Sequence, residues 1–408
     1  MGKAFVNYRV EDRSFVSYVK REIHLEVSRA QFTEKQVASI DIIVSELTSN
    51  LIKHAGSGEI LYRTTESDSG SIFEVICIDR GPGMSDPDRM MVDGVSTSGT
   101  LGQGLGAISR LSTRSQIYST RGVGTVVYSM VSSITAKKVR SLNPQVEVKG
   151  LCVSKPRESS CGDGYEVLRG NSATKVFLGD GLGHGEHAKA AVDHAKDVFL
   201  TSEEMEPVEI IRGMHEKVKR TRGLVVAIAV FDEIASEIKI CGVGNIAVRL
   251  FNGLHLKNYM SYNGTVGLNI PNSMKESTFP IEKNQHLVMC SDGIKSRWNI
   301  GQYPSIFKYD NIVLAASLYR DNFRGNDDAS VERAHDVLGR GVVARRAGEE
   351  AGGDQAEHDG DGGPSRAARA HFCSAHVRRP PADRARLALL RRRVDAGRRS
   401  DRNRPPCH

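Results

Sequence analysis

The sequence predicts an α/β protein of two domains, joined by a short linker and followed by a tail of different composition. A chain of 408 residues has room for two or three domains of ordinary size. Its 39% hydrophobic and 26% charged residues match the balance of globular proteins. Residues 1–132 combine helical and strand periodicity, and from Val146 short strands alternate with a helical stretch. We therefore expect each domain to bury its own core.

The best defined element of the first segment is a helix that begins after Thr33. Thr33 and Gln36 fit a capping box, in which both side chains satisfy free backbone donors at a helix start. The apolar residues that follow recur at steps of three and four, which predicts one buried stripe. They are Val37, Ile40, Val44, Leu47 and Leu51. Glu46 and Asn50, one turn apart, share a different face.

The elements around this helix are predicted from shorter signals. A strand near Ala4–Tyr8 and a helix over Arg13–Val27 precede it. The apolar run Ile72–Ile78 predicts a strand that ends in a turn with glycines. A cluster from Gly99 to Gly106 precedes a helical stretch, and Gly122-Val123-Gly124 indicates a hairpin.

Three groups of residues in this segment suit nucleotide chemistry. They are Glu46-x-x-x-Asn50 with Lys53-His54, Asp79-x-Gly81-x-Gly83, and Gly99-Thr100-Leu101-Gly102-Gln103-Gly104-Leu105-Gly106. A carboxylate can orient or deprotonate an attacking hydroxyl or water, and an amide oxygen suits Mg²⁺. Asp79 could accept a hydrogen bond from the exocyclic amine of a base. Glycines let backbone amides approach phosphates, and a following helix N-terminus adds a favourable dipole.

Each group alone has a plainer explanation, because Glu-x-x-x-Asn is usually a solvated helix face and Asp-x-Gly-x-Gly usually a turn. In this order and spacing, residues 1–132 resemble the Bergerat-fold (GHKL) ATPases of the gyrase, chaperone, histidine-kinase and mismatch-repair superfamily. Asp93 to Gly102 resembles the small anti-sigma-factor and stressosome switch serine kinases. The resemblance implies an α/β sandwich that binds ATP, with Glu46 as catalytic carboxylate, Asn50 as Mg²⁺ ligand, Asp79 at adenine and the glycines around the nucleotide.

Four acidic turns follow downstream. They are Cys161-Gly162-Asp163-Gly164, Gly179-Asp180-Gly181-Leu182-Gly183-His184-Gly185, Ser291-Asp292-Gly293 and Asn326-Asp327-Asp328-Ala329-Ser330. The apolar runs Val176–Leu178 and Leu287–Cys290 would bring Asp180 and Asp292 to strand ends. Carboxylates gathered without Cys or His ligands suit Mg²⁺ or Mn²⁺. Two such ions can activate a water for attack on a phosphate ester.

A single Asp-Gly is more often a turn than a ligand, but the four turns together resemble the PPM-type phosphatases of the sporulation and stress-response branch. The resemblance covers about residues 146–330 and implies an α-β-β-α sandwich with serine/threonine phosphatase activity. It implies that Asp180 bridges two metals, assisted by the Gly181 carbonyl. Asp163, Asp292 and Asp327 would complete the cluster, with Asp327 chosen over Asp328 by motif alignment alone. His184 is either a general acid or a loop residue.

The chain departs from that family after Ser330. The family continues into an apolar strand, whereas here Val331 is followed by Glu332-Arg333-Ala334-His335-Asp336, so we expect the strand to be missing. Residues 331–408 also lack Ile, Lys and Tyr. This composition predicts a disordered tail and motivates the hypothesis of a shifted reading frame or a recent replacement. The predicted boundaries are therefore 1–132, a linker at 133–146, 147–330, and a tail at 331–408.

Composition excludes several other classes of protein. Residues 331–408 hold 17 Arg against 11 acidic residues, which leaves 39 basic and 38 acidic residues before them, so we expect no nucleic-acid partner. No apolar run approaches the roughly 18–20 residues of a membrane span, and Met1–Arg9 lacks a signal peptide, so a cytoplasmic protein is expected. The seven scattered cysteines form no C-x-x-C pair and are expected to be reduced, mostly structural thiols.

Together, these expectations predict a bacterial partner-switching regulator. Its first domain would bind ATP with Mg²⁺, and its second would use Mn²⁺ or Mg²⁺ to remove phosphate from serine or threonine. The implied partner is a STAS-type anti-sigma-antagonist or a stressosome protein. The first domain would either transfer phosphate itself or only gate the phosphatase, and a defective phosphatase would leave a nucleotide-controlled binding module. The sequence predicts no particular oligomeric state.

Overall fold

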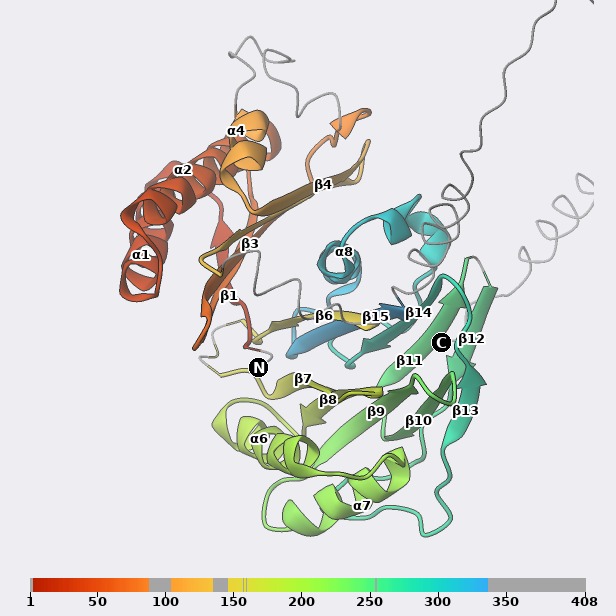
Figure 1. Ribbon diagram of the computed structural model, residues 1–408. Helices are drawn as coiled ribbons and strands as arrows, with labels where there is room; N and C mark the ends of the chain where they lie inside the picture. The colour runs from red at the N-terminus through yellow and green to blue at the C-terminus, as the bar shows by residue number, and fades with distance from the viewer. Residues whose placement is uncertain are drawn as a thin grey trace, which may run out of the picture. The chain divides into compact units, whose positions relative to one another are not determined.

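The computed structural model describes residues 3–87, 104–134 and 146–336, apart from residues 157, 159 and 254. All of these residues lie in one unit that runs from Met1 to Ala351. They form three five-stranded antiparallel sheets, with helices layered against them (Figure 1). The predicted tail beyond Asp336 and residues 135–145 of the predicted linker lie outside the described residues.

The first module contains one sheet, in the order β1-β2-β3-β5-β4, with helices on one face. Its elements are β1 (Val6–Val10), α1 (Arg13–Arg29), α2 (Glu34–Asn50), the π-helical turn η1 (Leu51–Ala55), β2 (Gly58–Ser67), β3 (Gly70–Asp79), α4 (Gly104–Leu111), β4 (Arg114–Thr120) and β5 (Gly124–Ser132). The predicted α1, α2 and β3 are confirmed to within a few residues, and the hairpin joins β4 to β5.

The start of α2 carries the predicted capping box. The Thr33 hydroxyl accepts a hydrogen bond from the Gln36 amide at 3.3 Å, and Gln36 Oε1 accepts one from the Thr33 amide at 3.0 Å. The stripe of α2 packs with α1 on the sheet and buries Ile40, Val44 and Leu47. Glu46 and Asn50 lie on a different face of α2 and are partly buried.

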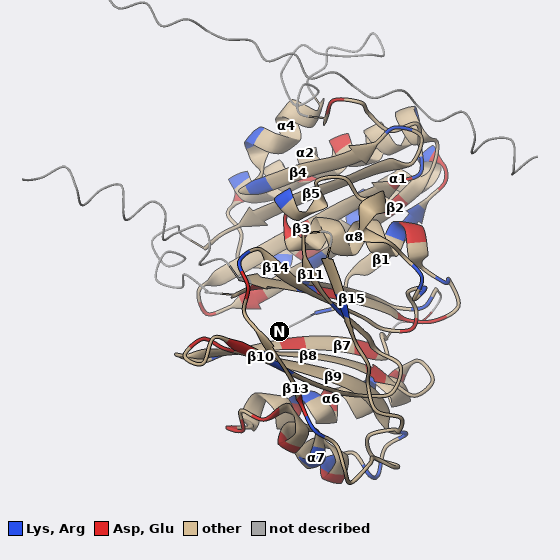
Figure 2. Cartoon of the chain, turned by 90° about the vertical axis from the view of Figure 1, so that its right-hand side faces the viewer, with Lys and Arg blue, Asp and Glu red and all other residues tan. Residues whose placement is uncertain are grey.

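The second module is a sandwich of two sheets with helices outside. One sheet has the order β13-β10-β9-β8-β7 and is covered by α6 and α7, and the other has the order β12-β11-β14-β15-β6 and is covered by α8 (Figures 1 and 2). The strands are β6 (Val146–Val153), β7 (Asp163–Arg169), β8 (Ala173–Gly181), β9 (Leu224–Asp232), β10 (Glu237–Val243), β11 (Ala247–Asn252), β12 (His255–Tyr259), β13 (Ser277–Pro280), β14 (Gln285–Cys290) and β15 (Ala329–Asp336). The helices are α6 (Glu186–Thr201), α7 (Pro207–Lys217), the 3₁₀ turns η2 (Ile300–Gln302) and η3 (Ile306–Lys308), and α8 (Asn311–Asn322).

The prediction that no strand follows Ser330 is wrong. β15 runs from Ala329 to Asp336 and pairs with β14 on one side and β6 on the other. Strand pairing uses backbone N–H and C=O groups, so the polar side chains of this segment do not prevent it. Glu332 and Arg333 are buried there, at 1% and 0% exposed. The second module therefore continues six residues beyond its predicted end.

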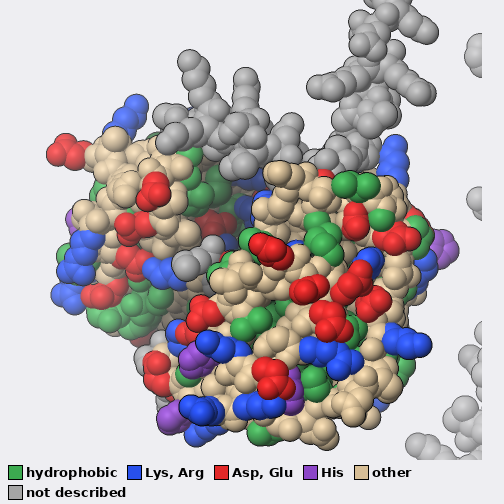
Figure 3. Space-filling model, turned by 60° about the horizontal axis from the view of Figure 1, so that its bottom comes forward, with side chains coloured by type: hydrophobic (Ala, Val, Ile, Leu, Met, Phe, Trp, Pro, Cys, Tyr) green, Lys and Arg blue, Asp and Glu red, His purple; other side chains and the backbone are tan. Residues whose placement is uncertain are grey.

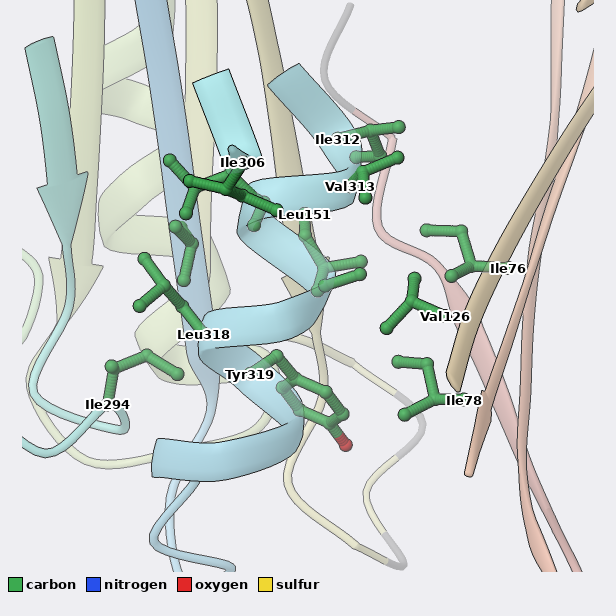
Figure 4. Close-up of a cluster of buried hydrophobic side chains, with 14 of the residues drawn as sticks. Ile76, Ile78, Val126, Leu151, Ile294, Ile306, Ile312, Val313, Leu318 and Tyr319 are labelled. Atoms are coloured by element: carbon green, nitrogen blue, oxygen red, sulfur yellow. The ribbon is translucent and has the colours of Figure 1, made fainter. Parts of the chain in front are cut away.

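Helix α8 of the second module packs on its own sheet and also against the sheet of the first module. All of its residues except Asp321 are buried, which is typical of a helix that is covered on every side. Figure 4 shows Ile76, Ile78 and Val126 of the first sheet pointing toward Val313 and its neighbours on α8, and all belong to one buried cluster. The second face of the first sheet is thus covered by the second module.

Two surface properties complete the description. No helix within the described ranges is long and apolar enough to cross a membrane. Acidic and basic side chains are interspersed on the face drawn in Figure 3.

Candidate functional site

The residues of the candidate nucleotide site lie where α2 contacts the start of α4. A Cβ atom at Gly104 would lie 2.6 Å from Glu46 Oε2 and 3.6 Å from Asn50 Nδ2. A side chain cannot be accommodated at the first of these distances without displacing the Glu46 carboxylate. Glycine therefore brings the backbone of α4 directly against the two polar groups, where amide donors and a helix N-terminus suit a phosphate.

Asp79, the predicted adenine contact, is the last residue of β3. Its Oδ1 accepts hydrogen bonds from the backbone amides of Gly81 at 2.8 Å and Thr125 at 3.1 Å. Burial raises the pKa of the Asp79 carboxyl above its ordinary value. Oδ2 has no hydrogen-bond partner within the described part of the chain, so it can accept a bond from a ligand amine.

The other predicted nucleotide contacts divide into four sets. Gly83 has a φ of +65°, and a Cβ atom there would lie 2.2 Å from the Thr120 carbonyl oxygen, so the position requires glycine. Lys53 and His54 are exposed on η1, one turn after Asn50. Gly81 follows Asp79, and Gly106 is buried in α4. The predicted positions Gly99, Thr100 and Gly102 lie outside the described residues.

The second site is built from the ends of four strands. β7 and β8 are antiparallel neighbours, and their register places Asp163 directly opposite Asp180. Asp292 follows β14, and Asp327 precedes β15. Asp180, Asp292 and Asp327 line one cavity of about 450 Å³. Other residues in its wall are Lys155, Leu182, His184, Asn245 and Asn263.

The gathered carboxylates repel one another. Burial, followed by the charges of Asp292, Asp327 and Asp328, raises the pKa of Asp180 to about 8. Burial and the charge of Asp180 also raise the pKa of Asp163 well above its ordinary value. A divalent cation would remove this repulsion, so the donor set fits a hard metal ion such as Mg²⁺ or Mn²⁺.

Neighbouring side chains form hydrogen bonds with two of the carboxylates. The Ser291 hydroxyl donates to Asp163 Oδ2 at 2.6 Å, and Asn245 Nδ2 donates to Asp292 Oδ2 at 2.8 Å. Within the described residues, no three His, Cys, Asp or Glu side chains converge closely enough to hold a metal as they stand. Binding would therefore require the carboxylates to turn toward a shared ion.

The two adjacent aspartates have different surroundings. Asp328 Oδ1 accepts the Lys155 amide at 2.6 Å, and Asp328 Oδ2 accepts the Gly162 amide at 2.7 Å. Asp328 therefore joins the loops at residues 155 and 162. Asp327 lines the cavity instead, and this arrangement favours Asp327 as the metal ligand.

Two further predicted positions lie beside the cavity. The Gly181 amide donates to the Gly162 carbonyl at 3.1 Å, and a Cβ atom at Gly181 would lie 2.2 Å from the Ala188 carbonyl oxygen. His184 lines the cavity, and its Nδ1 lies 2.8 Å from Glu158 Oε1. Both interpretations of His184 therefore remain predictions.

Sequence reasoning missed three residues of this second site. Ser291 precedes a predicted ligand, so its position in Ser291-Asp292-Gly293 could have suggested a role. Lys155 and Asn245 carry no such signal, because each lies in a loop far along the chain from the carboxylate that it accompanies.

Comparisons with known proteins agree with the two-module arrangement. Residues 15–130 match the histidine kinase-like ATPase domain, and residues 170–304 match the stage II sporulation protein E (SpoIIE) family. The serine/threonine-protein kinase RsbT of Bacillus subtilis (strain 168) is 36% identical over 93 residues, which are 23% of this chain and 70% of RsbT.

Two solved structures are similar to parts of the chain. One comes from work on the bacterial stressosome as a modular system adapted to control secondary messenger signalling. It is 24% identical, with a TM-score of 0.45, and the match covers 47% of this chain and all of that one. The other holds the PP2C phosphatase domain and a regulatory fragment of SpoIIE from Bacillus subtilis. It is 12% identical, with a TM-score of 0.39, over 79% of this chain and 94% of that one.

The fold and the matched families define a kinase-like GHKL ATPase module fused to a PPM-type phosphatase module. Through its first module the chain belongs to the family of the serine/threonine-protein kinase RsbT. Its modules imply use of a nucleotide and of divalent metal.

Proposed function

We propose that the chain is a partner-switching regulator that binds ATP in its first module and removes phosphate from serine or threonine of a partner protein in its second. The observation that carries the proposal is the cavity that Asp180, Asp292 and Asp327 line together, with Asp163 opposite Asp180 in the strand register. Acidic oxygen donors of this kind suit two-metal phosphate ester hydrolysis.

In the proposed phosphatase site, Asp163, Asp180, Asp292 and Asp327 hold the metal ions, with the Gly181 carbonyl beside them. Divalent cations, when bound, supply an activated water and offset the charge that develops on the phosphate. Ser291 and Asn245 keep two of the carboxylates in place through their hydrogen bonds. Lys155 lines the same cavity, and its ammonium attracts the phosphate of the substrate.

In the proposed nucleotide site, Asp79 accepts a hydrogen bond from the adenine amine, and the start of α4 faces the phosphates. Asn50 binds Mg²⁺, while Glu46 orients the hydroxyl that receives phosphate. The contact between Gly104 and Glu46 supports this arrangement. The relative RsbT is a serine/threonine kinase, which supports transfer to a serine or threonine. From the resemblance to the anti-sigma-factor and stressosome switch kinases, the proposed substrate is a STAS-type anti-sigma-antagonist or a stressosome protein.

A second function, nucleotide gating of the phosphatase, is favoured by one set of contacts. Arg80 follows the adenine-contacting Asp79 and donates a hydrogen bond to the carbonyl of Arg320, near the end of α8. Only a short segment separates the end of α8 from Asp327. A change at the nucleotide pocket therefore has a direct route to a proposed metal ligand.

The phosphatase proposal is tested by Asp180→Asn. The variant should lose nearly all Mn²⁺-dependent release of phosphate from a chromogenic phosphate ester and from a phosphoserine protein. Asp193→Asn, which changes a half-buried residue of α6 that pairs with Lys189 outside the proposed site, is the matched control and should keep wild-type activity. Full activity in Asp180→Asn would refute the site assignment.

Glu46→Ala separates the roles of the first module. The variant should still bind ATP but should transfer no phosphate to a partner. If the wild type also transfers none to any candidate partner, the gating function is favoured over the kinase function.

A further inference from the structure

Two cysteines meet beside the second site. Cys152 lies on β6, and Cys161 lies in the loop just before β7. Their sulfur atoms are 3.1 Å apart. Five cysteines are described, and all five are buried free thiols. Their sequence positions, nine residues apart and outside any C-x-x-C motif, gave no sign of this pairing.

Both cysteines border a large cavity. The cavity has a volume of about 1250 Å³, and its walls include Cys152, Cys161 and Asp163. Cys161 is 7% exposed and Cys152 is 1% exposed. Both sulfur-bearing residues therefore lie at the wall of a cavity that a small oxidant can enter.

We propose that Cys152 and Cys161 form a reversible disulfide that acts as a modification site, with a peroxide as oxidant. One sulfur attacks a peroxide oxygen, breaks the O–O bond and becomes a sulfenic acid, with release of water. The second sulfur then attacks the sulfenic sulfur and displaces a second water. Two thiols and one hydrogen peroxide thus give one disulfide and two waters, and a dithiol reverses the change.

Disulfide formation would disturb the proposed metal site, a consequence that rests on the proposed phosphatase function. The two sulfurs must close from 3.1 Å to about 2.05 Å. Cys152 is held in the sheet by the pairing of β6 with β15. The loop that carries Cys161 must therefore move. Gly162, next in that loop, bonds Asp328 and Gly181, and Asp163 follows it.

The disulfide itself is tested on the full chain without any activity assay. The reduced protein is treated with hydrogen peroxide, alkylated, digested without reductant and analysed by mass spectrometry. We expect a linked peptide that joins Cys152 to Cys161, together with the loss of two of the seven thiols and their recovery with dithiothreitol. Oxidation without this linkage would overturn the proposal.

The effect on the metal site is tested with matched variants. Oxidation of the wild type should weaken Mn²⁺ binding on the order of tenfold, as loss of metal-supporting contacts does, and dithiothreitol should restore it. Cys152→Ala should resist oxidation, whereas Cys241→Ala, a change at another buried cysteine, should behave as the wild type. If peroxide weakens Mn²⁺ binding by Cys152→Ala as much as by the wild type, the disulfide does not control the metal site. A reduced wild type that hydrolyses no phosphate ester would instead overturn the proposed function, while the linked peptide still decides the disulfide.

Discussion

Glu332 is an acidic residue in an environment that does not suit a charge. Its side chain is buried in β15, and neither carboxylate oxygen has a hydrogen-bond partner within the described ranges. Burial and the charge of Glu166 raise the pKa of Glu332 well above its ordinary value, against the opposing charges of Lys196 and Arg169. A buried carboxylate without a partner destabilises the fold.

Glu332→Gln should therefore stabilise the protein and reduce its pH dependence. Because the folded-state pKa is raised, the wild type is most stable below the unfolded pKa of roughly 4.3 and loses stability as the pH rises from there toward the folded pKa. The variant should gain about 1 kcal/mol or more at pH 8, measured by urea unfolding at pH 5 and pH 8. The exposed Glu203→Gln is the control, and an equal gain there would contradict the argument.

A single substitution, Gly104→Ala, tests the proposed nucleotide site. The added methyl group would lie 2.6 Å from the Glu46 carboxylate. The neighbouring atom is the end of a flexible side chain, so the methyl group should shift the Glu46 carboxylate beside the proposed phosphate site, and ATP affinity should fall. Binding is measured with a fluorescent ATP analogue. Gly170→Ala, where the nearest atom lies at 3.5 Å, should bind as the wild type does.

Secondary-structure elements differ in how far the sequence predicts them. Helix α2 was predicted because its capping box and apolar stripe are local signals. Helix α8 was not predicted, because a helix buried on all sides has no polar face to give a period. β15 was predicted to be absent, because its polar residues hide the backbone pairing that holds it. The strand-end carboxylates could be proposed from the sequence because each lies in or beside a recognisable turn.

Arg80→Ala tests the route through α8. The change removes the hydrogen bond to the Arg320 carbonyl but leaves Asp79 and the glycines in place. ATP should still bind, while any effect of ATP on the phosphatase rate should disappear. Arg121→Ala, at the exposed β4–β5 hairpin, should keep the effect. If ATP still changes the rate in Arg80→Ala, α8 does not carry the coupling through this contact.

The two modules share one hydrophobic cluster across α8. Burial of each large apolar side chain, such as Ile76, Ile78 or Val126, contributes about 1.5–3 kcal/mol. Polar bonds join the modules as well, since Asn7 and Glu59 of the first both bond the Tyr319 hydroxyl of α8. The modules should therefore unfold together.

Trp298, the single tryptophan of the chain, reports on the second module. ATP with Mg²⁺ binds the first module, so by linkage it should raise the temperature at which Trp298 fluorescence changes. An unchanged Trp298 transition, with ATP binding shown separately, would indicate that the modules unfold independently.

The central claim, that this chain removes phosphate from a partner protein, is tested most directly by phosphosite mass spectrometry. A serine-phosphorylated STAS-domain protein is incubated with the full chain and Mn²⁺. The wild type should return the phosphoserine to serine, and Asp180→Asn should leave it phosphorylated. Phosphoserine that persists with the wild type, or disappears equally with Asp180→Asn, would contradict the account.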